Sequence, residues 1–295
     1  CRRLGADVAH VPYFAPPLAS SVPVVVTIHD LIPMVLPENR GDARFRLYIR
    51  LVAAAARRAA LVLTDSRASA RDIHRLLGIP EERVRVIYLA ADPRYRPQTP
   101  AECRPVIDRL ALPSRYLLYL GGFQRRKNVP ALLRALARAG ARLDGAKLVV
   151  GGGLPERETP LTPDPRRIAR ELGLGDAVQF IGRVAEEDKP ALYSGALALV
   201  FPSRYEGFGL PPLEAISCGT PAIVGQGSSL EEVVGPGGVS VVGDDVEALA
   251  EALVTLATDA ARRAELSRAG LHHAPRFSWA TTARETLQAY RDAAS

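Results

Sequence analysis

The sequence predicts an α/β protein with two domains, each built around a mostly parallel β-sheet. Apolar runs of four to six residues alternate with longer stretches of helical periodicity along the 295-residue chain. Strands that alternate with helices indicate right-handed crossovers between parallel strands. Prolines crowd together between residues 93 and 113, and they predict a linker near 93–114 that separates the two halves.

The first half carries the signals of four strands and two helices. The strands are expected at 7–11, 23–28, 60–64 and 84–88. The helices are expected at 44–59 and 70–77, and the spacing of Ser69 and Asp72 predicts a capping pair for the second helix.

The second half repeats the alternation six times. Its strands are expected at 116–120, 147–150, 178–181, 197–201, 221–224 and 239–242. Asn128 is expected to cap a helix that runs to Ala139 and ends at Gly140. Further helices are expected at about 165–172, 187–195, 211–218 and 245–257. The domains are therefore predicted as 1–105 and 106–276, with a C-terminal helix in 277–295 that would cross back to the first domain.

Composition limits the class of protein and its compartment. The chain is 47% hydrophobic and 24% charged, which is typical of globular proteins. No apolar run approaches the roughly 20 residues of a spanning helix, and no signal peptide is visible at the N-terminus. Cys1, Cys103 and Cys218 lack the spacing of metal ligands, and their odd number predicts free, reduced thiols and no set of disulfides. We therefore expect a cytoplasmic protein.

The positive charge comes almost entirely from arginine. The net charge is +6, yet only three lysines occur. An anionic substrate or surface would explain the excess, and so would an arginine-rich proteome. Aromatic residues are sparse and do not interleave with a basic stripe, so we expect no nucleic-acid partner.

The stretch from Tyr205 to Pro221, YEGFGLPPLEAISCGTP, holds two glutamates eight positions apart. It follows an expected strand, and a proline pair beginning at Pro211 suits the first turn of a helix. The loop therefore lies at the carboxyl end of a parallel sheet, where such folds bind ligands.

The residue types in this loop indicate a nucleotide-sugar. Glycines and a helix N-terminus favour an anion such as a diphosphate. Glu214 would accept bonds from a ribose diol, and Glu206 would accept bonds from sugar hydroxyls. The alternative for Glu214 is a structural role, since a carboxylate in a first helical turn is favourable with the helix dipole. A structural role for Glu206 also stays open.

These residues resemble the E-x7-E signature of family 4 retaining glycosyltransferases, which have the GT-B fold. Four further stretches resemble motifs of that family: 119–136, 24–33, 180–196 and 277–279. The resemblance covers nearly the whole chain and is greatest to members that add mannose, rhamnose or similar sugars to bacterial surface glycans. It implies two Rossmann-like domains that face each other across a cleft.

The resemblance implies a role for each residue of the donor site. Lys127 is similar to the lysine that contacts the donor diphosphate. Many relatives carry arginine where this chain has Gly122, so Arg125 or Arg126 would substitute. Backbone amides of the loop would hold sugar or phosphate, and two residues would border the base. The implied donor-binding set is Gly122, Arg126, Lys127, Arg183, Val184, Glu206, Gly207, Phe208, Gly209, Leu210 and Glu214.

His29 matches the acceptor-domain histidine of the family, so His29 and Glu206 are the implied catalytic residues. A histidine at the end of an apolar strand is otherwise more often structural. Asp30 would either orient the imidazole or cap the turn.

The implied reaction transfers a hexose from the nucleotide-sugar donor to a hydroxyl of a glycan or lipid-linked acceptor, with retention of configuration. We expect neither cofactor nor metal, because the sequence has no DxD flanked by apolar strand residues and no His/Cys cluster. Positive charge and backbone donors can stabilise the leaving nucleotide diphosphate. Two alternatives stay open: an inactive nucleotide-sugar-binding protein, and another α/β enzyme such as an epimerase or a dehydrogenase. No G-x-G-x-x-G follows a strand, which disfavours the dehydrogenase.

The first domain raises two further expectations. In helix 44–59, Phe45, Ile49, Val52 and Ala56 share one face while Arg46, Arg50 and Arg57 form a second stripe. That stripe is either a solvated face or a contact with anionic lipid at the inner face of a membrane. The chain begins with cysteine, and the family's first strands and glycine-rich loop have no counterpart. We therefore expect an incomplete acceptor domain, and no sugar transfer by this 295-residue chain alone.

Overall fold

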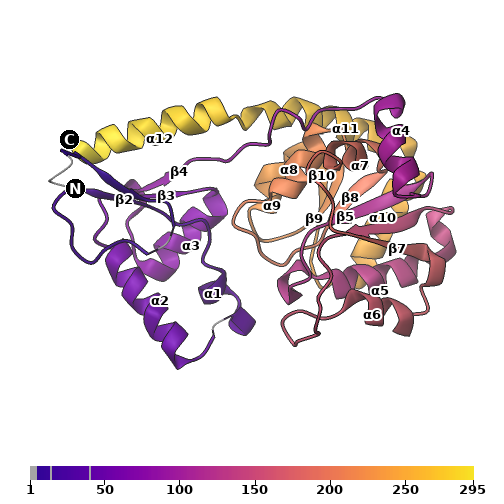
Figure 1. Cartoon of the computed structure of the whole chain (residues 1–295), viewed down its shortest axis with the longest axis horizontal. Helices are drawn as coiled ribbons and strands as arrows, with labels where there is room; N and C mark the ends of the chain where they lie inside the picture. The colour runs from indigo at the N-terminus through magenta and orange to yellow at the C-terminus, as the bar shows by residue number, and fades with distance from the viewer. Residues whose placement is uncertain (1–4, 14, 40) are drawn as a thin grey trace. The chain divides into compact units, whose positions relative to one another are not determined.

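The computed structural model describes residues 5–13, 15–39 and 41–295, and the chain divides into two units (Figure 1). The first unit comprises the described residues up to Ala90 together with 206–208 and 277–295. The second comprises Ala91–Tyr205 and Gly209–Arg276. Residues 91–105, which the sequence suggests for the first domain, thus lie in the second unit.

The first unit contains a parallel sheet of four strands in the order β1-β2-β3-β4. The strands are β1 (Ala9–Val11), β2 (Val24–Thr27), β3 (Leu61–Thr64) and β4 (Val84–Val86). The helices are α1 (Ile32–Val35), α2 (Ala43–Ala56), α3 (Arg67–Leu77) and α12 (Trp279–Ala294). Right-handed crossovers that add strands in one direction leave their helices on one face of a sheet. The other face therefore needs a cover from elsewhere in the chain.

Helix α12 supplies that cover. Side chains alternate across each strand, so Val25 points to one face and Val26 to the other. Val26 packs with residues of α2 and α3, whereas Val25 packs with Ala289 and Ala293 of α12. Figure 1 shows α12 in yellow on one side of these strands and α2 and α3 on the other.

The second unit contains six parallel strands in the order β10-β9-β8-β5-β6-β7. They are β5 (Tyr116–Leu120), β6 (Lys147–Gly151), β7 (Val178–Gly182), β8 (Ala198–Phe201), β9 (Ala222–Gly225) and β10 (Gly238–Val241). In chain order this is the doubly wound pattern that reverses direction between its first and fourth strands, here β5 and β8. Ligands of such sheets bind outside the carboxyl ends of the strands at that reversal.

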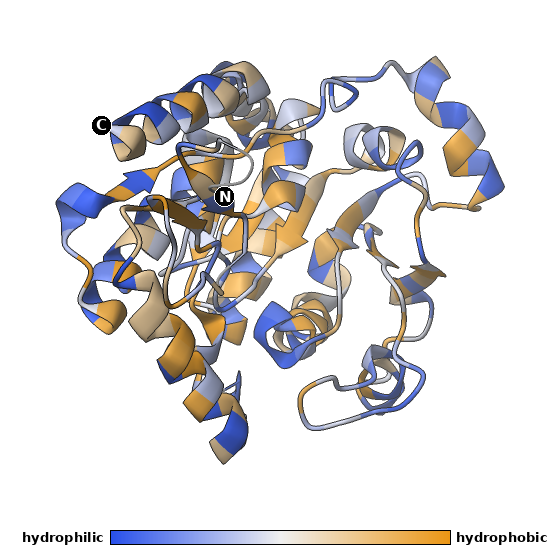
Figure 2. Ribbon diagram, turned by 60° about the vertical axis from the view of Figure 1, so that its left-hand side comes forward, coloured by the Kyte–Doolittle hydropathy of each residue, from blue (hydrophilic) through white to orange (hydrophobic). Residues whose placement is uncertain are grey.

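Eight helices cover this sheet. They are α4 (Pro100–Arg109), α5 (Val129–Ala139), α6 (Pro165–Glu171), α7 (Lys189–Gly195), α8 (Leu210–Ser217), α9 (Leu230–Val234), α10 (Val246–Thr258) and α11 (Ala260–His273). Helix α5 packs with α6 and α10, whereas α8 packs with α7, α9 and α11. Both faces of the sheet are thus covered, and Figure 2 shows the central strands in orange, as hydrophobic segments.

Two predicted caps differ from the observed ones. Helix α3 begins earlier than expected, because Ser66 is its N-cap and accepts a bond from the Ser69 amide at 3.0 Å. The predicted Ser69–Asp72 pair is therefore wrong. Asn128 does precede α5, but its backbone is left-handed and its side-chain amide donates to the Gly243 carbonyl instead of capping the helix.

The proline-rich stretch expected as a linker contains helix α4. Thr99 and Glu102 form a reciprocal capping box at its start, and Pro100 occupies the first turn, where no intrahelical N–H is needed. Pro100 thus begins the helix, and Pro105 lies inside it without ending it. Cys103 on α4 and Cys218 are buried free thiols, while Cys1 lies outside the described residues. In the part of the chain that the structure describes, no helix has the length and apolar content needed to cross a membrane.

Candidate functional site

A cavity of about 540 Å³ opens at the carboxyl ends of β5, β6 and β7 in the second unit. This volume lies within the usual range of small-molecule sites. The cavity lies at the place where a doubly wound sheet binds its ligand. The structure brings five predicted donor residues to its wall, together with residues that the sequence did not single out. The lining consists of Leu120, Gly121, Gly122, Gly151, Gly152, Gly153, Arg183, Val184, Lys189, Tyr193, Leu210, Pro211 and Glu214.

Glycine backbone forms one wall of the cavity, where the ends of β5 and β6 approach each other closely. Gly152 has φ of +149°, and a Cβ atom there would lie 2.0 Å from the carbonyl oxygen of Gly121. The Gly152 amide donates to the Gly182 carbonyl at 2.7 Å and so joins the end of β7. No side chain fits at this position, so a ligand meets backbone there.

The start of α8 offers fewer amide donors than the sequence suggested. The helix begins at Leu210 and its N-cap is Gly209. The next two residues are Pro211 and Pro212, which carry no N–H. Leu210 is therefore the only residue of the first three that can donate a backbone bond to an anion. Binding of an anion at this end of the helix would therefore depend more on charged side chains, and less on backbone amides, than we expected.

Glu214 is the fifth residue of α8, so the expectation that it lies in the first turn is wrong. The helix-dipole explanation for this carboxylate weakens accordingly, because that effect is confined to the terminal turn. The side chain is buried, and its Oε2 accepts a hydrogen bond from the Tyr193 hydroxyl at 2.7 Å. Burial raises the pKa of Glu214 above its usual value, and the Tyr193 bond opposes that rise.

Tyr193 is itself fully buried on α7. Burial, followed by the nearby charge of Glu214, raises the pKa of Tyr193 well above its usual value, so its hydroxyl stays a donor. The Tyr95 ring lies edge-on to Tyr193 with ring centroids 6.0 Å apart. The Tyr95 hydroxyl donates to Glu186 at 3.0 Å. A tyrosine pair thus fixes the Glu214 side chain at the cavity wall.

Two cationic side chains line the same cavity. Lys189 stands one helical turn before Tyr193 on α7 and pairs with Glu186. A Cβ atom on Gly153 would lie 3.2 Å from the Arg183 Nε, so this guanidinium lies against the glycine wall. Both side chains place positive charge at the wall of the cavity.

Arg126 and Lys127 are not part of that lining. Arg126 Nη1 donates to the Tyr205 carbonyl at 3.2 Å, which holds the backbone immediately before Glu206. The Lys127 ammonium lies 4.7 Å from the centre of the Phe201 ring, in a cation–π contact. Their predicted contact with a donor phosphate stays a prediction.

Of the other predicted residues, His29 and Glu206–Phe208 lie in the first unit, whereas Gly209 lies in the second. A Cβ atom on Gly207 would lie 2.5 Å from the His29 carbonyl oxygen and 2.9 Å from Asp30 Cβ. The Ser69 hydroxyl contacts the carbonyl oxygens of His29 and Gly207 at 3.1 and 3.3 Å. The middle of the glycine loop therefore lies against the turn that carries His29, and no larger residue fits there.

Asp65, and not Asp30, orients His29. The His29 Nδ1 lies 2.7 Å from Asp65 Oδ2, and its Nε2 lies 3.2 Å from the Pro12 carbonyl. Asp30 accepts a bond from the Ile32 amide and caps the turn. The hydrogen bond to Asp65 raises the pKa of His29, although partial burial opposes this effect. Both ring nitrogens thus face acceptor oxygens.

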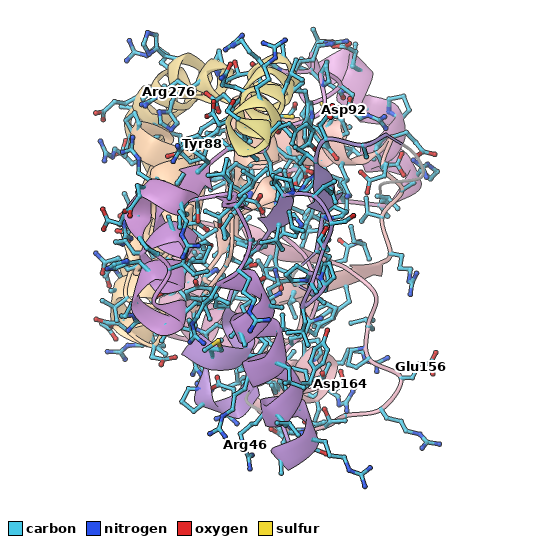
Figure 3. All side chains as sticks on the ribbon, turned by 90° about the vertical axis from the view of Figure 1, so that its left-hand side faces the viewer. Arg46, Tyr88, Asp92, Glu156, Asp164 and Arg276 are labelled. Atoms are coloured by element: carbon cyan, nitrogen blue, oxygen red, sulfur yellow. The ribbon has the colours of Figure 1, made fainter. Side chains whose placement is uncertain are left out.

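Glu206 and Phe208 are both buried. The Phe208 ring packs edge-on to Phe277 at 5.8 Å and lies 6.3 Å from the Tyr88 ring, which Figure 3 labels. This aromatic cluster fixes the loop on the carboxyl side of Glu206. The FSW stretch that begins at Phe277 thereby gains a structural explanation.

Among the residues that the structure describes, no group of three or more His, Cys, Asp or Glu side chains is arranged to hold a metal ion. The predicted independence from metals and cofactors stays a prediction.

Sequence comparison decides the family. The sequence model of the glycosyl transferases group 1 matches residues 107–273, which is more than half of the chain. This chain belongs to that family. The model described as Glycosyltransferase Family 4 matches residues 1–95 as well. The fold is accordingly GT-B, as predicted.

Two curated relatives of this glycosyltransferase come from Escherichia coli. O-antigen chain mannosyltransferase B is 36% identical over 271 residues, which cover 90% of this chain and 70% of the relative. Serotype-specific mannosyltransferase WbdA is 30% identical over 279 residues, which cover 92% of this chain and 34% of the relative. The chain thus spans about a third of WbdA's length.

Solved structures agree on the fold. Sucrose-phosphate synthase from Thermosynechococcus elongatus has a TM-score of 0.81 at 27% identity, over 98% of this glycosyltransferase and 74% of that chain. Anabaena Alr3699/HepE in complex with UDP and glucose has a TM-score of 0.78 at 23% identity, over 90% and 71% of the two chains.

Sequence reasoning missed Tyr193, Lys189 and Asp65 in this glycosyltransferase. Asp65 carried a readable signal, because it follows β3 as His29 follows β2, and these strands are parallel neighbours. Lys189 and Tyr193 are four residues apart, so they share a helix face. Their approach to Glu214 depends on the packing of α7 against α8, which no local pattern reveals.

We expect Asp65→Asn to destabilise the first unit more at pH 6 than at pH 9. The raised pKa of His29 means that its stabilising charge pair is present below the unfolded pKa of about 6.5 and is lost as pH rises through the folded pKa. The imidazole is 42% exposed, so solvent screening limits the effect to about 1 kcal/mol. Urea unfolding at both pH values measures it, and an equal effect at both would contradict the pairing.

We expect Tyr193→Phe to show the opposite pH dependence. It removes the Tyr193 hydroxyl donor from a buried carboxylate, at a cost of roughly 1–3 kcal/mol. Because the pKa of Glu214 is raised, the loss should shrink at acidic pH, where the carboxyl becomes neutral. Tyr116→Phe is the matched control, since its buried hydroxyl donates to the neutral Leu192 carbonyl at 2.9 Å. Equal pH profiles for the two variants in thermal unfolding would refute this account.

Proposed function

We propose that this glycosyltransferase moves a mannose-like hexose from a nucleotide-diphosphate sugar to an acceptor hydroxyl with retention of configuration. The observation that carries the proposal is the buried Glu214–Tyr193 pair at the wall of a glycine-lined cavity. A buried carboxylate that faces a cavity suits a vicinal diol, which donates two hydrogen bonds to it. The two mannosyltransferase relatives support a hexose donor, and HepE is a neighbour with UDP.

In this proposal, different residues of the cavity bind different parts of the donor. Glu214 holds the ribose, and Val184 borders the base. Arg183, Lys189 and the Leu210 amide stabilise the diphosphate as it leaves, without a metal or cofactor. The loop residues Glu206–Gly209 hold the transferred sugar.

His29 acts at the reacting carbon in this proposal. Asp65 fixes the ring orientation and stabilises positive charge on it. Positive charge on the ring stabilises the phosphate oxygen of the departing diphosphate, which gains negative charge as its bond to the sugar carbon breaks. The acceptor is a glycan or a lipid-linked glycan in bacterial polysaccharide or glycolipid synthesis, as the O-antigen relative suggests.

Binding and product analysis test the proposal. Calorimetry of the 295-residue chain against GDP-mannose, dTDP-rhamnose and UDP-glucose should show binding of at least one at micromolar concentration, and NAD should not bind. With an acceptor glycan added, transfer from the α-configured donor should give an α-linked product by NMR. Binding of NAD alone would favour a dehydrogenase. Donor binding without turnover would favour the inactive binding protein.

A further inference from the structure

A second hollow, of about 390 Å³, opens at the carboxyl ends of the strands in the second unit. Its volume lies within the usual range of small-molecule sites. It shares no lining residue with the glycine-lined cavity described above. Three of its lining residues are arginines, three are prolines and one is an acid. The lining consists of Arg125, Asn128, Pro130, Ala131, Arg134, Pro160, Pro163, Arg204 and Asp244.

The loops that follow β5, β6, β8 and β10 surround this hollow, and hydrogen bonds join them to one another. The Arg125 amide donates to the Leu161 carbonyl at 2.7 Å, which joins the first two loops. The Arg204 amide donates to the Arg126 carbonyl at 2.8 Å, which adds the third. The Asn128 side chain donates to a backbone carbonyl of the loop after β10. A ligand would therefore meet walls that are already formed.

Two of the three arginines carry charge that the chain does not compensate. Arg204 pairs with Asp244 at 2.8 Å, which accounts for the one acid of the lining. Within the part of the chain that the structure describes, neither Arg125 nor Arg134 forms an ion pair. Arg138, one turn further along α5, pairs with a glutamate of α10 at 2.8 Å. The hollow thus keeps a net positive charge, whereas the neighbouring surface of α5 is neutralised.

The acidic residues of the loop after β6 do not supply the missing negative charge. Glu158 pairs with Arg167 at 2.7 Å. Asp164 pairs with Arg166 at 2.8 Å. Figure 3 labels Glu156, whose side chain extends outward from this loop. None of these three carboxylates is part of the lining.

The prolines give the hollow rigid apolar walls between its charged groups. Pro130 precedes Arg134 by one turn of α5, so the two side chains share a face of the helix. Pro160 and Pro163 add two further rings from the loop after β6. Apolar walls with a few placed charged groups are typical of sites for small molecules. Guanidinium groups bind phosphate through pairs of parallel hydrogen bonds.

We propose that this hollow binds a phosphorylated saccharide. Arg125 and Arg134 bind the phosphate group, and the proline rings pack against the apolar face of the sugar ring. A neutral sugar would leave both guanidinium groups without an anion, and inorganic phosphate would leave the proline walls unused. A free sugar phosphate and a phosphorylated glycan carry the same group, so both satisfy this chemistry. The site does not depend on the proposed donor site, because the two linings are separate.

Calorimetry of the 295-residue chain tests this inference with mannose 6-phosphate, glucose 6-phosphate, inorganic phosphate and mannose as probes. At least one sugar phosphate should bind more tightly than inorganic phosphate, mannose should not bind, and added salt should weaken the binding. Arg134→Gln should weaken it about tenfold or more, which is the scale of a hydrogen bond between charged groups. Arg125→Gln combined with Arg134→Gln should abolish it.

A mannose oligosaccharide that carries the same phosphate distinguishes the two sources of the ligand. Tighter binding than that of mannose 6-phosphate would assign the hollow to a phosphorylated glycan. Equal or weaker binding would assign it to a free sugar phosphate.

The control is Arg138→Gln, which replaces an arginine of the same helix outside the lining and should bind as the parent does. All three substituted arginines are exposed, so circular dichroism should show unchanged folding. Binding should also persist in the presence of saturating GDP. Displacement by GDP, an equal loss in Arg138→Gln, or no binding of either sugar phosphate at millimolar concentration would overturn the inference. Failure of GDP itself to bind would count against the proposed function and not against this site.

Discussion

His29→Ala is expected to lower the rate of sugar transfer about a hundredfold while the dissociation constant of the donor changes less than threefold. A positioned histidine at a reacting centre contributes on the order of 10² to 10⁴ in rate. The donor residues of the cavity lie in the second unit, whereas His29 and its partner Asp65 lie in the first. His29→Ala should therefore lower the rate of transfer and leave the affinity for the donor nearly unchanged.

The measurement pairs initial rates of sugar transfer with donor calorimetry on the same preparations. Asp65→Asn should lower the rate less than His29→Ala, because it disturbs the orientation of the ring but keeps the ring. If His29→Ala retains transfer within threefold of the parent, His29 is structural and the proposed catalytic role fails.

Glu214→Ala is expected to weaken the binding of a nucleoside diphosphate by about 1.5–3 kcal/mol, which is roughly 10- to 150-fold in Kd. This is the scale of hydrogen bonds that involve a charged group. The variant also leaves the buried Tyr193 hydroxyl without its acceptor, so the protein itself should lose roughly 1–3 kcal/mol of stability. Affinity is therefore measured at a temperature where the variant is fully folded, so that a loss of binding is not a loss of folding.

Calorimetry with GDP and with UDP measures this effect. The control is Glu231→Ala, which replaces another glutamate of the second unit that lies outside the cavity lining and accepts the Gly227 amide. Its affinity for the nucleotide should match that of the parent. Unchanged affinity in Glu214→Ala would remove this carboxylate from the ribose.

The sheets of this protein were predictable because buried parallel strands are continuous apolar runs. The expected strand 116–120 coincides with β5, and the other strands shift by a residue or two at their ends. The strand ends also located the Glu206–Glu214 loop correctly after β8. The helix in the proline-rich stretch was missed because the prolines were taken only as helix breakers. Thr99, Pro100 and Glu102 form the pattern of a helix N-terminus.

The side-chain partners were harder to predict than the elements. Glu214 and Tyr193 lie on different helices, 21 positions apart, and only the packing of α7 against α8 joins them. His29 illustrates the same limit, because the adjacent Asp30 was the natural candidate while the distant Asp65 makes the contact. Local sequence identifies a chemical group, but tertiary packing chooses its partner.

The most direct test of the central claim is a cycle that combines a protein change with a ligand change. Calorimetry would compare the parent and Glu214→Ala, each with GDP and with 2′,3′-dideoxy-GDP, and again with the uridine pair. If Glu214 holds the ribose diol, the dideoxy nucleotide should bind the parent about 1.5–3 kcal/mol more weakly than the natural nucleotide does. The natural nucleotide should bind Glu214→Ala more weakly than it binds the parent, by a similar amount. The two losses should not add, because they delete the same interaction. Fully additive losses, or a dideoxy nucleotide that binds the parent as tightly as the natural one, would contradict the nucleotide-sugar site described for this cavity.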